Sequence, residues 1–166
     1  LKRDADIVVF NHPLRTNATF DSHLKKLSGY DIIELDSGRS TENEYWDTAL
    51  SAGNYSFALA NDDLHKPDRT GAIAVRSNFV CTPTAQYSDI KKALLDGSFY
   101  SMRIADYGKG DWQIKRAKNR DIPYIKNIGT VDSSIFIALS EKADSIKVTG
   151  QNHTTLHLAT ATDSVG

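Results

Sequence analysis

The sequence is poor in cysteine, has almost no net charge and contains no long hydrophobic run. Its one cysteine, Cys81, excludes an internal disulfide framework and leaves the cellular compartment open. No apolar stretch reaches the roughly 20 residues of a membrane-spanning helix, so we expect no membrane partner. The net charge is −1, from 20 basic and 21 acidic residues, which gives no electrostatic reason to expect a nucleic-acid partner.

The remaining composition is that of an ordinary globular protein. The 166 residues are 40% hydrophobic and 25% charged, which is enough for a domain with a real core. The chain begins at Leu1, and its single methionine is Met102. We therefore expect a trimmed N-terminus, and the sequence assigns no localisation.

The first sixty residues alternate between apolar β-branched runs and amphipathic stretches. The short β-rich runs predict buried strands, and apolar residues at helical spacing predict helices. Gly29 and Gly53 are suited to end the two helices. Alternation of strands and helices through short loops is typical of parallel βαβ units. The predicted order is strand 5–10, helix 21–27, strand 30–35, helix 42–52 and strand 57–60.

The character of the chain changes near residue 107. Before that point the pattern predicts a strand at 70–76 with an extension over 78–82, a helix at 87–95 and a strand at 98–102. Beyond Pro123, alternating β-branched runs separated by turn residues predict antiparallel strands. We therefore expect a first region over residues 1–106, a connector over 107–124 and a β-rich region over 125–166.

Candidate metal ligands follow two of the predicted strands. Asp63 and His65 come directly after the strand at 57–60, and His12 follows the strand at 5–10, where Pro13 favours an extended conformation. Because the carboxyl ends of parallel strands meet at one edge of a sheet, we expect the three side chains to converge. Carboxylate and imidazole groups suit a divalent transition metal that keeps one position open for water. The alternative is a polar turn in which an aspartate caps the next segment.

Other polar residues are weaker candidates. Arg39 and Ser37 lie in a loop after the strand at 30–35, where they could hold a phosphate oxygen, although an ordinary polar loop is the more common case. Glu34 could face the same edge, but a solvated strand position is more common for a glutamate. Cys81 has no basic neighbour in sequence and is expected to be a buried small apolar residue.

Four short motifs, taken in order, resemble the second half of a polymerase and histidinol phosphatase (PHP) domain. The resemblance covers roughly residues 5–105. The motifs are Asn11-His12-Pro13, Asp31-Ile-Ile-Glu34 with Ser37-Gly-Arg-Ser40, Asn61-Asp-Asp-Leu-His65, and Ala93-Leu-Leu-Asp-Gly-Ser-Phe-Tyr100.

The resemblance implies a fold, a chemistry and a ligand set. The fold would be α/β: the second half of a distorted (β/α)7 barrel over residues 1–106, followed by the first antiparallel strands of a C-terminal extension. Family members are mostly metal-dependent phosphoesterases with clusters of Mn, Zn, Fe or Mg. By position, His12 resembles a ligand of the third family motif, and Asp63 and His65 resemble the Asp-x-His pair of the fourth. The implied function is hydrolysis of a small-molecule phosphate ester by metal-activated water.

The chain departs from the family pattern at its start. The His-x-His motif and the ligands that precede the His-Pro strand are absent, so we expect a fragment of a longer protein. A site with fewer ligands is expected to bind metal weakly or not at all and to hydrolyse little. Cut sheet edges would also favour a dimer. Two alternatives remain: a non-catalytic binding or interaction module on a similar scaffold, and a different metal-dependent hydrolase.

Overall fold

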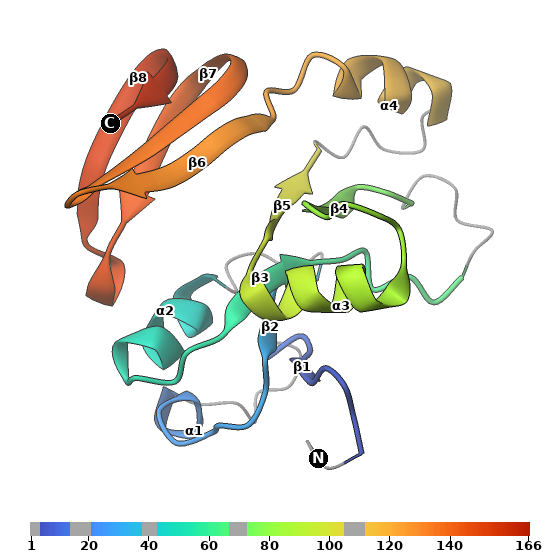
Figure 1. Cartoon of the computed structure of the whole chain (residues 1–166), viewed down its shortest axis with the longest axis vertical. Coiled ribbons are helices and arrows are strands. Elements are labelled where there is room, and N and C mark those ends of the chain that lie inside the picture. Colours follow the sequence, from blue (N-terminus) through green and yellow to red (C-terminus); the bar gives the residue numbers. More distant parts are fainter. Residues whose placement is uncertain (1–3, 14–20, 38–42, 67–72, 105–111) are drawn as a thin grey trace. The chain divides into compact units, whose positions relative to one another are not determined.

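The computed structural model describes residues 4–13, 21–37, 43–66, 73–104 and 112–166 (Figure 1). The chain separates into two compact units, Leu1–Lys109 and Gly110–Gly166, which are described here one at a time. The division falls inside the stretch 107–124 that the sequence indicated as a connector. No helix in the described ranges is both long enough and apolar enough to cross a membrane.

The first unit contains a small parallel sheet in the order β1-β2-β3. Val9 pairs with Ile32, and Ile33 pairs with Ala58, both in parallel register. This confirms the predicted parallel arrangement of the first three strands. The elements of this part are β1 (Val9–Phe10), α1 (Asp21–Leu24), β2 (Ile32–Asp36), α2 (Asn43–Ser51) and β3 (Phe57–Ala60).

The core of the first unit gathers around the middle strand, β2. Leu24, Tyr30 and Ile33 form a buried apolar cluster, and Trp46 of α2 packs against it. The indole nitrogen of Trp46 donates a hydrogen bond to the backbone oxygen of Ser56, at 3.0 Å, which fixes the ring against this cluster. β2 has a strand along each edge, and crossover helices cover the faces of a parallel sheet, so Ile32, Ile33 and Glu34 are all at or below 1% exposure.

The strands that follow do not extend this parallel sheet. β4 (Arg76–Val80) and β5 (Phe99–Arg103) form a separate antiparallel pair, joined through α3 (Tyr87–Asp96). Helix α3 ends at Gly97, which has a left-handed φ of 73°, and the chain returns directly to the end of β4. There the backbone N–H of Cys81 donates to the oxygen of Ser98, at 2.8 Å. Because β5 begins where β4 ends, the two strands must run in opposite directions.

The side chain of Asn78 connects β4 to the end of β3. Its amide nitrogen donates to the backbone oxygen of Ala60, at 2.7 Å, and its amide oxygen accepts from the backbone N–H of Ala60, at 3.1 Å. The hydroxyl of Ser101 on β5 donates to the same amide oxygen, at 2.7 Å. A single side chain therefore makes the paired bonds that a neighbouring strand would otherwise supply.

The second unit is an antiparallel three-stranded sheet in the order β6-β7-β8. The register of β7 against β8 shifts between Ala138 and Ala143, where β7 has extra residues relative to β8. Ile146, at 9% exposure, is the one buried hydrophobic side chain among the described residues of this unit. Its elements are α4 (Trp112–Asn119), β6 (Ile125–Val131), β7 (Ser134–Thr149), the short 3-10 helix η2 (Gln151–His153) and β8 (Thr155–Val165).

The predicted partial (β/α)7 barrel is wrong. The described part of the chain is mostly β and forms three small sheets rather than one continuous parallel barrel wall. The prediction fails at β4, because a barrel needs each helix to carry the chain back for another parallel strand. Helix α3 instead delivers β5 antiparallel to β4. Cys81 is also exposed rather than buried, since it lies in the turn after β4.

Candidate functional site

The carboxyl ends of β1, β2 and β3 lie at one edge of the sheet, because the three strands are parallel. His12 follows β1, Ser37 follows β2, and the segment 61–65 follows β3. This edge is where open parallel sheets usually carry their reactive groups. It is therefore the candidate site of the first unit.

Glu34 is the residue that joins the strand ends. Its carboxylate is 1% exposed, which overturns the expectation of a solvated strand position. One oxygen accepts the backbone N–H of His12, and the other accepts the side-chain amide of Asn61. A carboxylate removed from water needs such partners, because burying it without them is strongly unfavourable. Glu34 thus holds the ends of β1 and β3 on either side of β2.

His12 lies at this edge because it follows the end of β1, and its backbone has an unusual conformation. Its φ is 30°, a left-handed conformation that non-glycine residues adopt at a cost. The extended conformation expected before Pro13 is therefore wrong. Pro13 itself is fully buried and fixes the chain at this point. The backbone N–H of His12 donates to the carboxylate of Glu34, which holds this residue at the sheet edge.

Asp63 and His65 lie together in a turn rather than in an extended segment. Asp63 has a φ of 45°, and its backbone N–H donates to the side-chain oxygen of Asn61, at 2.7 Å. The Nδ1 atom of His65 lies 2.6 Å from the backbone oxygen of Asp63 and 3.7 Å from its carboxylate. Because Nδ1 faces that carbonyl, Nε2 is the ring nitrogen left for a ligand.

The structure brings two of the three predicted ligands together. Within residues 4–13, 21–37, 43–66, 73–104 and 112–166, no three His, Cys, Asp or Glu side chains are grouped so that they could hold a metal ion. His12 therefore shares the sheet edge with Asp63 and His65 without completing a ligand group. Ser37 is buried at 8% exposure directly after β2, whereas Arg39 lies outside the described residues.

A cluster of ion pairs that the sequence did not predict joins the end of β2 and the segment after β3 to β4 and β5. Nε of Arg76 is 2.6 Å from a carboxylate oxygen of Asp36, and Nη1 of Arg76 is 3.9 Å from Asp62. Arg103 lies 3.3 Å from the second carboxylate oxygen of Asp36. The partners are up to 67 residues apart, between Asp36 and Arg103, so no local pattern indicates the cluster.

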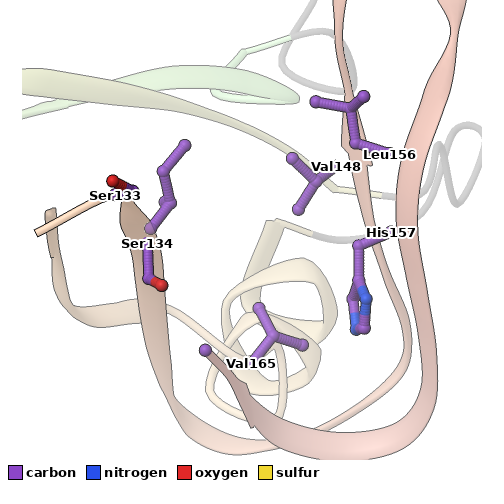
Figure 2. A pocket seen from close by; sticks show the side chains of 8 residues that line it. Ser133, Ser134, Val148, Leu156, His157 and Val165 are labelled. Atoms are coloured by element: carbon purple, nitrogen blue, oxygen red, sulfur yellow. The ribbon is translucent and has the colours of Figure 1, made fainter. Parts of the chain in front are cut away.

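The second unit contains an open cavity of about 420 Å³ (Figure 2). Apolar side chains of β7 and β8 line it, among them Val148, Leu156 and Val165, and His157 lies beside them. No side chain that lines this cavity carries a fixed charge, so the cavity fits an apolar group better than a metal ion or a phosphate.

No family model, no curated protein and no solved structure matches this chain.

Proposed function

We propose that the carboxyl edge of β1, β2 and β3 is part of the metal centre of a PHP-type phosphoesterase that acts on a small-molecule phosphate ester. The observation that carries the proposal is the buried carboxylate of Glu34, which binds the backbone at His12 and the side chain of Asn61 at once. Reactive and ligand-binding groups of open parallel sheets gather at the carboxyl ends of the strands, which is where this carboxylate joins β1 and β3.

His12, Asp63 and His65 are the proposed ligands. Imidazole nitrogen and carboxylate oxygen are donors that Mn, Zn and Fe accept, and the carboxylate also suits Mg. A bound metal would lower the pKa of a coordinated water toward neutrality. Two adjacent donors and a third at the same edge are few for tight binding, so we propose weak metal binding and little hydrolysis by this chain.

Mn²⁺ titration followed by NMR tests this proposal, because paramagnetic broadening detects weak binding. The chain contains five histidines, so His23, His153 and His157 serve as internal controls. We expect the ring signals of His12 and His65 to broaden at lower Mn²⁺ concentrations than those of the three controls. Asp63→Asn should remove this preference. Equal broadening of all five rings would contradict the proposal.

A binding module is the second candidate function, and the sheet of the second unit favours it. Val131, Leu156 and Leu158 are each more than half exposed, at 59%, 64% and 58%. Leu156 and Leu158 are two residues apart on β8 and so project from the same face of the sheet, where contiguous exposed apolar side chains mark interaction surfaces. The proposed partner is a second copy of this chain. Light scattering that shows a monomer at high concentration would exclude it.

A further inference from the structure

Strand β7 bends back toward itself within the second unit. Val148 comes 14 positions after Ser134, so a straight strand would place the two residues roughly 45 Å apart. Both residues nevertheless line the same cavity of about 420 Å³ (Figure 2). The two ends of β7 therefore face each other across this cavity.

The bend lies where β7 and β8 are both irregular. The register of the pair shifts between Ala138 and Ala143, and a strand with extra residues bends at such a point. Ala143 pairs with Thr162, and the adjacent Ala161 of β8 has a left-handed φ of 50°. A left-handed backbone is unfavourable for an alanine and persists where the surrounding structure imposes it. The backbone of both strands therefore shapes the cavity.

The cavity combines apolar walls with hydrogen-bonding side chains. Figure 2 shows Ser133 and Ser134 on one side, and Val148 and His157 on the other. Val148 is the direct cross-strand partner of His157, so the imidazole ring stands next to an apolar wall. Among the residues that the structure describes, none makes a hydrogen bond to the side chains of Ser133, Ser134 or His157. These three polar groups are therefore available to a ligand.

We propose that this cavity binds a small uncharged molecule with an apolar body and one hydroxyl or amide head group, which bonds to the His157 ring. A neutral imidazole offers one donor and one acceptor, and a hydroxyl or amide can match either. A carboxylate or phosphate would lose its hydration without gaining an opposite charge, because no lining side chain carries a fixed charge.

The volume of the cavity limits the size of this ligand. At about 30 Å³ for each water molecule, 420 Å³ corresponds to roughly 14 waters, which suits a molecule of about ten to fifteen non-hydrogen atoms. Such a volume is at the small end of the range for ligand pockets. The site lies within residues 133–166 and is independent of the metal proposed for the first unit.

Titration of the full chain with 4-butylphenol, followed by NMR, tests the proposal. The signals of Val148, Val165 and His157 should shift together and reach saturation. The signals of Leu27, a leucine of the first unit that is 43% exposed, should not shift. Phenol lacks the apolar body, and 4-butylbenzoate carries a charge, so both should bind severalfold more weakly. Equal shifts at Leu27, or equal affinity for all three compounds, would overturn the proposal.

Two histidine variants test the head-group contact. His157→Phe keeps a ring of similar size without a hydrogen-bonding nitrogen, so it should weaken the binding of 4-butylphenol about fivefold. His153→Asn is the control, because His153 lies in η2 and does not line the cavity, and asparagine tolerates its left-handed φ of 59°. This control should bind as the wild type does. Undiminished affinity in His157→Phe would refute the assigned contact.

Variants that fill the cavity test its location. Val148→Phe should abolish the shifts at Val165 and His157, because the added ring occupies the space of the ligand. Thr160→Phe makes a similar change at an exposed residue of β8 outside the cavity and should leave the affinity unchanged. Ser134→Phe fills the cavity from the opposite side and provides the same test if Val148→Phe does not fold. Wild-type affinity in a folded filling variant would overturn the proposal.

Discussion

The middle strands of the two three-stranded sheets differ in burial: β2 is largely buried, and β7 is largely exposed. In β2, Ile32, Ile33 and Glu34 are all at or below 1% exposure. In β7, which is 16 residues long, Ile146 alone is buried. The difference follows from strand direction, because parallel strands need crossover helices that cover the sheet, whereas an antiparallel meander can leave its faces to water. The first unit can therefore hold a carboxylate in an interior, and the second offers an exposed surface.

Matched isoleucine substitutions test this comparison with the largest expected effect. Ile33→Ala removes a side chain at 0% exposure and should lower the free energy of unfolding by about 2–5 kcal/mol. Ile128→Ala on β6, at 58% exposure, should lower it by less than about 1 kcal/mol. Urea unfolding followed by Trp46 fluorescence, in a Trp112→Phe background, measures the first, and circular dichroism measures the second. Equal costs would show that the two sheets are buried alike.

Glu34→Ala tests whether the buried carboxylate holds the strand ends. The change leaves the backbone N–H of His12 and the amide of Asn61 without their acceptor, so we expect a loss of about 3 kcal/mol. The stability of Glu34→Gln should lie between those of the wild type and Glu34→Ala. The glutamine amide keeps one acceptor oxygen, but its NH₂ group faces one of the two donors, the His12 N–H or the Asn61 amide. Exposed Glu141 on β7, changed to alanine, is the control and should shift stability by less than about 0.5 kcal/mol. A Glu34→Ala protein as stable as this control would contradict the role assigned to Glu34.

Gly97→Ala sharpens the comparison within the first unit. A Cβ at Gly97 would overlap the ring of Phe57, which makes an edge-to-face contact with Phe99 at 6.3 Å. Gly53 is the matched control, because it also has a left-handed φ, 84°, but open space around its Cβ position. We expect Gly53→Ala to lower the free energy of unfolding by about 1 kcal/mol, from backbone strain alone, and Gly97→Ala to lower it by about 2 kcal/mol. Equal losses in thermal unfolding would mean that Phe57 moves aside freely.

The smallest expected effect comes from an exposed cluster on the first unit. The hydrogen bond from Lys91, and then that from Tyr87, lowers the pKa of the Asp6 carboxyl, and the same bond raises the pKa of Lys91. The stabilisation is therefore present above the usual pKa of an aspartate, about 3.9, and is lost as pH falls through the lower folded-state pKa. At the alkaline end it is lost as pH rises through the raised pKa of Lys91.

An NMR titration of the Asp6 carboxyl measures this. Its midpoint should lie below about 3.9 and should rise in Lys91→Ala, more than in Tyr87→Phe. An unchanged midpoint in Lys91→Ala would remove the assigned cause. Because the cluster is on the surface, it contributes little next to the buried contacts of β2.

Local pattern predicted most elements of the first unit, but not all of their bounds. The strand predicted at 70–76 begins only at Arg76, since residues 73–75 form a turn and 70–72 lie outside the described residues, and the strand predicted at 5–10 is only Val9–Phe10. The run Phe57–Ala60 forms β3 with the predicted bounds, and the predicted helix at 87–95 forms as α3. The antiparallel direction of β5 was missed, because it depends on where α3 returns the chain and not on the sequence of either strand. Gly97 follows α3, but a glycine alone does not tell in which direction the next strand pairs.

The position of the candidate site was predictable from the sequence. The buried polar contacts that hold its residues in place were not. Parallel strand order places His12 and Asp63 at one edge from pattern alone. The burial of Glu34 was not visible, since its partners lie 22 and 27 residues away in sequence. The same holds for Arg76, whose contact with Asp36 spans 40 residues. Long-range pairs of polar groups leave no periodic signal.

The Asn78 side chain has a consequence for association between molecules. The unpaired edge of a strand is a template along which a strand from another chain can pair, and such pairing leads to aggregates. At Ala60 both hydrogen-bonding groups are already taken by an amide of the same chain. Since an internal group competes at a far higher effective concentration than any neighbour in solution, β3 is protected from intermolecular growth at the position where its own sheet stops.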